Sequence, residues 1–435
     1  MQGAVAVLDI GKTLAKLVLF SPQGEALERL ERRNPPPAAE LDHAGIWAWL
    51  QGALASAARR FEIAAIVPMA HGAAAALVLD GEVFAAPDYE AEIPADVAAA
   101  YEAERDPFAA TLSPRLPAGL NLGAQLFFLE RRLPGLWPER AGCLLWPQFW
   151  AWRLSGVAAC EVTSLGCHSD LWRPRERRFS DLALRRGWSP RLGPLRRAAD
   201  ILGPVRPELA AELALPLTCK VHCGVHDSNA ALLAARAHPE AAEGFSLVST
   251  GTWFIAARSG GAEFEAYDPK GDMLAGVDVE GRPTPTARWM GGRAYEEGMG
   301  AHLGARSDRA RLAEAAAIPT LPAFTSTPPP LSRPSAVLPP EGGEMGRGDP
   351  ALVATVAALE LARGASRLLD LLEAEGPILI EGRFARDPAM MAALAALRAG
   401  QAVYAMADEA AFGALTLARP DASPAPLVCA EPAML

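Results

Sequence analysis

The sequence predicts an α/β fold made of two related halves, and three observations lead to this prediction. The chain has 435 residues, which exceeds one ordinary core and suits two domains of about 200 residues each. Runs with strand character alternate with helical patterns, as in a mostly parallel sheet. One local pattern, an apolar strand interrupted by a short Gly- and Thr-containing turn and then resumed, occurs twice, near residues 7–20 and 245–257.

The first half contains the following expected elements in chain order. Residues 4–33 are interpreted as two strands and a Gly-containing turn, 46–61 as a helix, 63–84 as strand, loop, strand and turn, 121–133 as an amphipathic helix, and 143–156 as a strand or loop that leads into a helix.

The second half begins near residue 240, and the predicted domains are 1–238 and 242–435. A strand, a loop and a helix from about residue 228 precede the second interrupted strand at 244–260. The chain then ends in α/β alternation: a helix at 350–373, a strand at 377–382, a turn, a helix at 388–399, a strand at 402–406 and a helix at 409–418. The proline-rich residues 318–342 are interpreted as a long surface excursion.

The charge of the chain argues against a nucleic-acid partner. The formal net charge is −10 and the pI is about 5.4, whereas proteins that grip a polyanion cluster positive charge. The one dense basic stretch, residues 173–198, is interrupted by acids and prolines, so a solvated helical face is favoured over a polyanion site.

Targeting and cysteine patterns predict a cytoplasmic protein without a membrane anchor. The chain enters a strand almost at once, without a basic leader, and its apolar runs are too short to cross a bilayer. Six scattered cysteines suit a reducing compartment. Cys219 and Cys223 could suggest a zinc site, but no second ligand pair follows at metal spacing, so a buried strand is favoured. The oligomeric state is left open, with a homodimer as one option.

The first interrupted strand carries Asp9, Gly11, Lys12 and Thr13 at its turn. Backbone N–H groups, an ammonium and a hydroxyl together suit phosphate oxygens, and a carboxylate beside them suits Mg²⁺. A glycine turn with an unrelated lysine is the plainer alternative. Thr250, Gly251 and Thr252 repeat the pattern, so the two turns could clamp a polyphosphate from both sides of a cleft. The glycine-rich motifs of P-loop and dinucleotide-binding proteins are absent.

A third motif, "GVHDSNAA", places Asp227 at the start of a helix. The helix dipole favours the ionised form of a carboxylate there, which a general base for a hydroxyl requires. A simple helix-capping role is the alternative.

These motifs together with "EGRFARDPAMMAALAAL" resemble, in order and spacing, the FGGY family of carbohydrate kinases. The resemblance spans nearly the whole chain. It implies two ribonuclease-H-like domains around a central cleft, as in actin, hexokinase and heat-shock chaperones. It also implies transfer of the γ-phosphate of ATP, with Mg²⁺, to a hydroxyl of a ketose or polyol.

The resemblance also implies roles for single residues. The catalytic base is Asp227, and the Mg²⁺ ligand is Asp9, with Asp227 as a further option. The nucleotide residues are Gly11, Lys12, Thr13, Lys16, Thr250, Gly251, Thr252, Gly382, Arg383 and Asp387. The sugar residues are His71, Gly72, Asp88, Tyr89, His226 and Asp227.

Some residues depart from the family pattern or indicate a subgroup. Arg383 and Phe384 replace glycines in the adenosine turn, so the adenine contacts must differ in detail. The "HD" pair before the catalytic helix and the "GTW" of the second turn favour the rhamnulose and fuculose kinases. That subgroup implies a six-carbon deoxyketose, whose methyl group Trp146, Phe149 and Trp150 could enclose.

Two other functions are weighed against a sugar kinase. Another phosphotransferase or ATPase of the actin fold is disfavoured by the sugar-type segments "MAHG" and "PDYE". A non-catalytic sugar-binding regulator is disfavoured because Asp9, Lys12, Asp227 and Thr252 are all retained.

Overall fold

The structure is a computed structural model that describes residues 3–35, 39–133, 135, 141–269, 272–318, 349–407 and 409–435. The chain forms two compact units. The first comprises Met1–Ala234, Ala275–Pro283 and Ala410–Pro424, and the second comprises Ala235–Leu274, Thr284–Glu409 and Ala425–Leu435. Apart from Ile318, the proline-rich stretch 318–342 lies outside the described residues.

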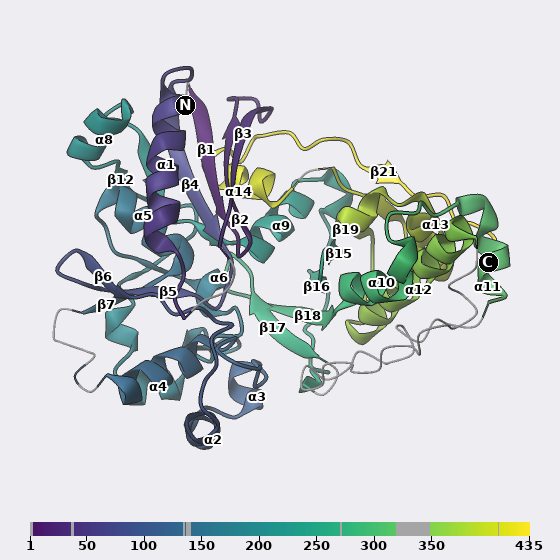
Figure 1. Ribbon diagram of the computed structural model, residues 1–435, viewed down its shortest axis with the longest axis horizontal. Helices are drawn as coiled ribbons and strands as arrows, with labels where there is room; N and C mark the ends of the chain where they lie inside the picture. The colour runs from purple at the N-terminus through teal and green to yellow at the C-terminus, as the bar shows by residue number, and fades with distance from the viewer. Residues whose placement is uncertain are drawn as a thin grey trace. The chain divides into compact units, whose positions relative to one another are not determined.

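A seven-stranded sheet organises the first unit, in the order β12-β13-β4-β1-β2-β3, and β14 also pairs with β4. β1 is antiparallel to β2 and parallel to β4 (Figure 1). The strands are β1 (Ala4–Ile10), β2 (Leu14–Phe20), β3 (Ala26–Arg33), β4 (Ile63–Ala70), β12 (Ile201–Pro204), β13 (Lys220–His222) and β14 (Val225–His226). Residues 4–33 therefore form three strands, and the prediction of two was wrong. β3 lies at the edge of the sheet and alternates exposed and half-buried residues. Its sequence is therefore less apolar than those of β1 and β2, and its strand signal is weaker.

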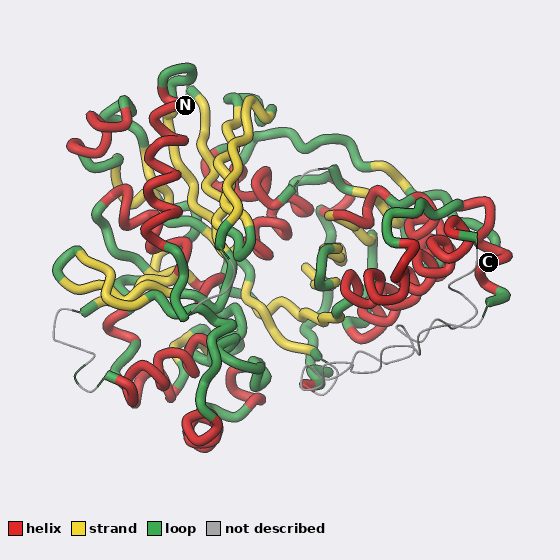
Figure 2. Tube along the Cα trace, in the orientation of Figure 1, coloured by secondary structure: helices red, strands yellow, loops and turns green. Residues whose placement is uncertain are grey.

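Helices cover both faces of this sheet (Figure 2). Ala6, Leu8 and Ile10 of β1 pack in one apolar cluster with α1 and α5, and because side chains alternate along a strand, Val5 and Val7 point to the opposite face. The C-terminal helix α14 also contacts β1 and β4. The helices are α1 (His43–Ala58), α2 (Ala95–Glu104), α3 (Phe108–Thr111), α4 (Leu122–Arg132), α5 (Trp146–Ser155), α6 (Val162–Leu165), α7 (Asp181–Arg185), α8 (Pro207–Leu213), α9 (Asp227–Arg236) and α14 (Ala410–Ala418).

Three small sheets complete the first unit. They pair β6-β5-β7, β10-β9 and β11-β8. Their strands are β5 (Ala75–Leu79), β6 (Glu82–Ala85), β7 (Gly142–Leu145), β8 (Cys160–Glu161), β9 (Trp172–Arg173), β10 (Arg178–Phe179) and β11 (Leu195–Arg196).

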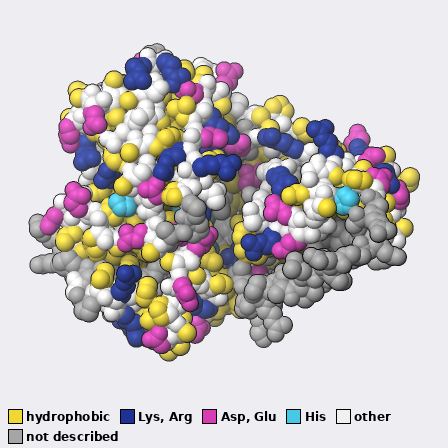
Figure 3. Space-filling view, viewed as in Figure 1, with side chains coloured by type: hydrophobic (Ala, Val, Ile, Leu, Met, Phe, Trp, Pro, Cys, Tyr) yellow, Lys and Arg dark blue, Asp and Glu magenta, His cyan; other side chains and the backbone are white. Residues whose placement is uncertain are grey.

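The basic stretch 173–198 is not the helical face that the sequence suggested. Only α7 in it is α-helical, and the β9–β10 hairpin precedes that helix. Several of its arginines are paired with acids: Arg173 lies 3.1 Å from Asp106, and Arg178 lies 2.8 Å from Asp181. On the face shown in Figure 3, the Lys and Arg side chains of the described residues are interspersed with Asp and Glu.

Another seven-stranded sheet, in the order β17-β18-β16-β15-β19-β20-β21, belongs mostly to the second unit, while the end of β17 from Ala275 and the first residue of β18, Pro283, belong to the first unit. Its strands are β15 (Phe245–Thr250), β16 (Phe254–Ser259), β17 (Met273–Val277), β18 (Pro283–Trp289), β19 (Ile378–Gly382), β20 (Val403–Ala405) and β21 (Val428–Cys429). Its helices are α10 (Gly291–Met299), α11 (Leu312–Ala316), α12 (Pro350–Leu371), α13 (Pro388–Leu397) and the 3₁₀ turn η8 (Arg383–Arg386). α12 and α13 pack in one apolar cluster with Val248, Ile378 and Ile380 of the sheet.

The two units share one strand arrangement, so the prediction of two related halves is confirmed. In each, a hairpin (β1–β2 or β15–β16) is extended by a parallel neighbour of its first strand (β4 or β19). Each of these parallel strands has a further parallel partner, β13 or β20. This mixed order is the ribonuclease-H-like arrangement that the sequence predicted.

Candidate active site

The first phosphate-type turn closes the β1–β2 hairpin. Asp9 pairs in register with Lys16, and the Lys16 ammonium lies 3.0 Å from the Asp9 carboxylate. Asn34, just after β3, donates from Nδ2 to the carbonyl of Gly11 at 2.9 Å, and its N–H donates to the carbonyl of Thr13 at 3.0 Å. Asn34 therefore holds the shape of the turn, while the Thr13 side chain stays exposed.

The side chain of Lys12 does not stay with the turn. Its ammonium donates to both carboxylate oxygens of Asp88 and lies 4.6 Å from the centre of the Tyr89 ring. Asp88 is 3% exposed and also accepts the N–H of Glu90 at 2.9 Å. Lys12, predicted to bind nucleotide, thus lies against two residues that were predicted to bind sugar.

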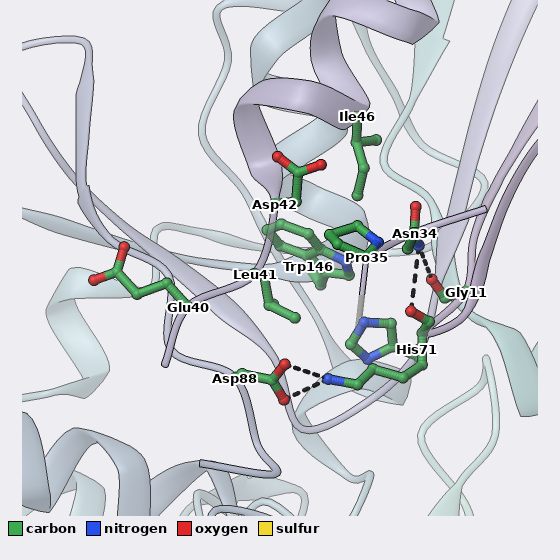
Figure 4. A pocket seen from close by; sticks show the side chains of 11 residues that line it. Gly11, Asn34, Pro35, Glu40, Leu41, Asp42, Ile46, His71, Asp88 and Trp146 are labelled. Atoms are coloured by element: carbon green, nitrogen blue, oxygen red, sulfur yellow. Dashed lines mark hydrogen bonds and ion pairs between the residues drawn. The ribbon is translucent and has the colours of Figure 1, made fainter. Parts of the chain in front are cut away.

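A cavity of about 20 Å³ opens beside this ion pair. Figure 4 shows its lining, which combines polar and apolar side chains. The lining residues are Gly11, Lys12, Asn34, Pro35, Glu40, Leu41, Asp42, Ile46, His71, Asp88 and Trp146. The volume is close to that of one or two water molecules, so an acceptor needs this pocket to widen.

His71 and Trp146 form part of the wall. Nδ1 of His71 donates to the carbonyl of Gly72 at 3.0 Å, which leaves Nε2 as an acceptor. Burial lowers the pKa of His71, so its ring is neutral at pH 7. The ring stacks edge-on against Tyr89 at 5.5 Å. The indole N–H of the buried Trp146 has no hydrogen-bond partner among the described residues.

The third motif places Asp227 at the first position of α9. Oδ1 of Asp227 accepts the N–H of Ser228 at 2.7 Å and lies 3.2 Å from Nε2 of His226. Nδ1 of His226 lies 3.0 Å from Oδ1 of Asn229. The contacts of Oδ1 with Ser228 and His226 orient the carboxylate. The side chain of Asp227 is one-third exposed, so it remains accessible to a ligand.

Cys167 contacts this motif through His226. The sequence interpretation did not include Cys167 among the site residues. Its sulfur lies 3.2 Å from Nε2 of His226. Burial by itself would raise the pKa of the thiol, but the rings of His168 and His226 lower it. Burial likewise disfavours the charged form of His226, while Cys167 and Asp227 raise its pKa.

Gly72 is required by this packing. A Cβ there would overlap the sulfur of Cys167 and lie 2.8 Å from Nε2 of His226. The structure therefore brings together Gly72, Cys167, His226 and Asp227, three of which were predicted to lie at the sugar site.

The second phosphate-type turn, in the second unit, closes the β15–β16 hairpin. The N–H of Gly251 donates to the carbonyl of Trp253 at 3.0 Å, and the carbonyl of Thr252 accepts the N–H of Gly292 at 3.1 Å. The side chain of Thr252 is exposed. Thr250, in contrast, is buried, and its hydroxyl donates to the carbonyl of Glu381.

The predicted adenosine turn joins this hairpin through Thr250. Gly382 has a φ of 86°, and a Cβ there would overlap the carbonyl oxygen of Thr250. The Thr250 hydroxyl also accepts the N–H of Phe384 at 3.1 Å. Only glycine suits position 382, because both the backbone angle and the contact exclude a side chain.

Arg383 and Asp387 flank that turn. Arg383 is exposed, lies 3.4 Å from Glu296 and stacks over the rings of Tyr295 and Phe384 at 5.3 and 5.1 Å. Asp387 caps α13, where Oδ1 accepts the N–H groups of Ala389 and Met390 at 3.0 Å. Asp387 therefore shapes the turn, while Arg383 remains accessible.

Similarity to known proteins agrees with this geometry. Residues 242–426 match the model of the carbohydrate kinase FGGY C-terminal domain. A carbohydrate kinase from Novosphingobium aromaticivorans is 40% identical, with a TM-score of 0.87, and the match covers 99% of this chain and 97% of that one. The chain belongs to the FGGY family of carbohydrate kinases.

Two more distant FGGY kinase structures share the fold. The xylulose kinase of Rhodospirillum rubrum is 20% identical, with a TM-score of 0.75, and the match covers 99% of this chain and 94% of that one. The ligand-bound xylulose kinase of Lactobacillus acidophilus is 14% identical, with a TM-score of 0.77, and the match covers 96% and 89%. A comparison with curated proteins gave no significant match.

This FGGY kinase is a phosphotransferase with an alcohol group as acceptor, and ATP is its co-substrate. None of the helices in the described part of the chain is long and apolar enough to cross a membrane. Among the described residues, no cluster of His, Cys, Asp and Glu could by itself hold a metal ion. Cys219 and Cys223 are buried around strand β13.

Proposed function

We propose that this FGGY kinase phosphorylates a six-carbon deoxyketose of the L-rhamnulose or L-fuculose type, with Asp227 as general base. The observation that carries the proposal is the placement of Asp227 at the start of α9. One of its oxygens is held by the Ser228 N–H and the His226 ring, and the side chain is partly open to solvent.

The proposed chemistry is a single displacement. Asp227 takes the proton of the acceptor hydroxyl as the oxygen forms a bond to the γ-phosphorus, and the bond to the β,γ-bridging oxygen breaks to release ADP. Positioning and charge neutralisation provide most of the rate enhancement in phosphoryl transfer. A general base contributes about 10²–10⁴-fold.

Mg²⁺ is proposed as the metal, and the donor set of the first turn fits it. Magnesium takes few carboxylates together with phosphate oxygens and water, which suits Asp9 as a single nearby carboxylate. The Lys16 ammonium lies 3.0 Å from the Asp9 carboxylate and orients it. When bound, Mg²⁺ would neutralise charge on the transferring phosphates.

Nucleotide phosphates are assigned to the two turns. Gly11, Thr13, Gly251 and Thr252 lie at the hairpin tips, where the exposed hydroxyls of Thr13 and Thr252 can meet phosphate oxygens. The N–H groups of the two glycines close the hairpins by bonding to the carbonyls of Leu14 and Trp253. Lys16 supports the first turn through Asp9. The adenosine is assigned to the turn of Gly382, Arg383 and Asp387, where the exposed guanidinium of Arg383 offers a flat face for an aromatic base.

A deoxyketose is favoured because part of the cavity wall is apolar. Pro35, Leu41, Ile46 and Trp146 line it and could hold a methyl group. Phe149 and Trp150, the other aromatic residues suggested for this role, are fully buried in the core with α5 and do not line the cavity. The apolar wall therefore has a different composition from the one expected.

Several broader features remain predictions from the sequence. These are the domain limits 1–238 and 242–435, a cytoplasmic location, the lack of a nucleic-acid partner, and an open oligomeric state with a homodimer as one option.

The test is a coupled ADP-release assay with L-rhamnulose, L-fuculose, D-xylulose and glycerol, each with and without Mg²⁺. We expect the highest kcat/KM with one of the two deoxyketoses, and activity that depends on Mg²⁺. A preference for D-xylulose or glycerol would reject the deoxyketose assignment. ADP release that does not depend on any acceptor would reject the kinase mechanism in favour of an ATPase.

A further inference from the structure

We propose that Lys12 is a specificity residue for the acceptor, and that the pocket selects a neutral polyhydroxylated acceptor over a sugar acid. This inference rests on the proposed function, because it takes the cavity beside His71 and Asp88 as the acceptor site. It differs from the role that the family resemblance implies, because it assigns Lys12, a residue of the first phosphate motif, to acceptor binding.

The position of Lys12 is the first argument. Its side chain leaves the turn and donates to both oxygens of Asp88, a residue 76 positions later in the chain. The Tyr89 ring lies on its other side, 4.6 Å away. The Lys12 side chain is only 15% exposed. The ion pair with Asp88 and the contact with the face of the Tyr89 ring hold it in the pocket wall.

The unused hydrogen-bonding capacity of the wall is the second argument. The indole N–H of Trp146 is a buried donor without a partner among the described residues, and an unpaired buried donor is costly unless a ligand satisfies it. Nε2 of His71 is an acceptor, because Nδ1 carries the proton that goes to Gly72. The pocket thus presents donors and acceptors together, which suits hydroxyl groups because each can both donate and accept.

Charge is the third argument. Among the described residues that line the cavity, the one ammonium, that of Lys12, is paired with Asp88, and the lining carboxylate of Asp42 is paired with Arg32. Glu40 adds a further negative charge, and burial keeps His71 neutral. A carboxylate on the acceptor would therefore enter a site whose net charge is already negative.

The Lys12–Asp88 pair also suggests how an acceptor is bound. Asp88 can accept from two neighbouring hydroxyls of a sugar, and Lys12 can then donate to an oxygen of the same molecule. When hydroxyl groups of the acceptor replace the direct Lys12–Asp88 contact, both charged groups keep hydrogen bonds. Neither group is then left buried and unpaired. A carboxylate would satisfy Lys12 but would repel Asp88.

The test measures binding by calorimetry without nucleotide, so that it does not depend on turnover. Matched pairs of acceptors are compared: L-rhamnulose with L-rhamnonate, and D-xylulose with D-xylonate. The variants are Lys12→Met, Lys12→Met/Asp88→Asn and the surface control Lys220→Met, and a non-hydrolysable ATP analogue is titrated separately into each.

We expect the wild type to bind each neutral acceptor at least about tenfold more tightly than its acid. Lys12→Met should weaken acceptor binding by about tenfold or more, the usual effect of losing a hydrogen bond to a charged group, and should leave the Kd for the ATP analogue within about twofold. Lys220→Met should change neither. If Lys12→Met does not fold, the double variant removes both buried charges and should show the same loss.

Equal or tighter binding of the acids would overturn the neutral-acceptor inference. If Lys12→Met loses binding of the ATP analogue while its acceptor binding is unchanged, Lys12 binds phosphate and the proposal is wrong. A failure of the proposed phosphoryl transfer would be seen separately, as acceptor binding without ADP release.

Discussion

The sulfur of Cys167 lies 3.2 Å from Nε2 of His226, and the same nitrogen lies 3.2 Å from Oδ1 of Asp227. Nδ1 of that ring is held by Asn229, whose own amide donates to the carbonyl of Val277 at 2.6 Å. The ring is therefore fixed from both sides, and through it the orientation of the Asp227 carboxylate depends on a buried thiol.

Replacement of Cys167 by Ala should lower kcat about fivefold, since one hydrogen bond of about 1 kcal/mol is lost. Cys167→Ser should recover part of the rate, because a hydroxyl can hydrogen-bond to His226 but, unlike a thiol whose pKa the neighbouring rings lower, does not ionise. The control is Cys219→Ala, which truncates another buried cysteine away from Asp227. Steady-state kinetics measure kcat for the three variants. Equal losses of kcat in all three would mean that Cys167 acts only through packing.

Replacement of Asp227 by Asn should reduce kcat by about 10²–10⁴-fold, because the amide cannot accept the acceptor proton. Acceptor binding should persist, since the amide keeps the size and shape of the side chain. Single-turnover kinetics together with calorimetry measure the two effects. Turnover close to that of the wild type would remove Asp227 from the mechanism.

Replacement of Thr252 by Val should raise the KM for ATP more than the KM for the acceptor, because an exposed hydroxyl at the second turn is lost. Asp9→Asn should raise the Mg²⁺ concentration needed for half-maximal rate, because a carboxylate is replaced by a weaker ligand. Initial rates over matrices of ATP, acceptor and Mg²⁺ distinguish these effects. An increase confined to the acceptor KM would show that the two turns have been assigned to the wrong substrate.

Replacement of Gly72 by Ala should destabilise the protein by about 1–3 kcal/mol, the usual cost of overpacking, because the new Cβ overlaps the sulfur of Cys167. The matched control is Gly52→Ala in α1, where a Cβ meets nothing within 4 Å. This second change should stabilise by about 0.5–1 kcal/mol, because alanine favours a helix. Denaturant unfolding measures both, and equal stability of the two variants would contradict the packing around Gly72.

Glu161 should make the protein less stable at alkaline pH. Burial raises the pKa of Glu161 from 4.5 to about 7, although the N–H groups of Thr163 and Ser164 and the Thr163 hydroxyl bond its Oε2. The raised pKa favours the protonated form in the folded state. Its stabilising contribution is therefore complete below pH 4.5 and is lost as the pH rises through 7.

Glu161→Gln should remove that contribution. Relative to the variant, the wild type should lose about 3 kcal/mol of unfolding free energy between pH 4.5 and pH 8. The control is Glu208→Gln on the exposed face of α8. Urea unfolding at several pH values makes the comparison, and parallel curves for the wild type and Glu161→Gln would show that Glu161 is ionised throughout.

Much of the site could be predicted because its motifs are local. The hairpin turns of Gly11 and Gly251 and the helix start at Asp227 each depend on a few consecutive residues, and the structure forms all three. The partner of Lys12 could not be predicted, because a long flexible side chain can reach several groups. The roles of Trp146 and Phe149 were equally ambiguous, since both are aromatic residues on one helix and only the packing of α5 turns Trp146 towards the cavity.

The sequence by itself therefore determined the α/β class, the two related halves, the order of the phosphate-type turns and the kinase family. Periodicity, glycine turns and helix starts are short-range properties that the chain carries at each position. Only the tertiary structure decided that Lys12 meets Asp88, that Cys167 supports His226 and that Asn34 holds the first turn. The Lys12–Asp88, Cys167–His226 and Asn34–Gly11 contacts join residues 76, 59 and 23 positions apart, and they arise only when distant segments pack into one core.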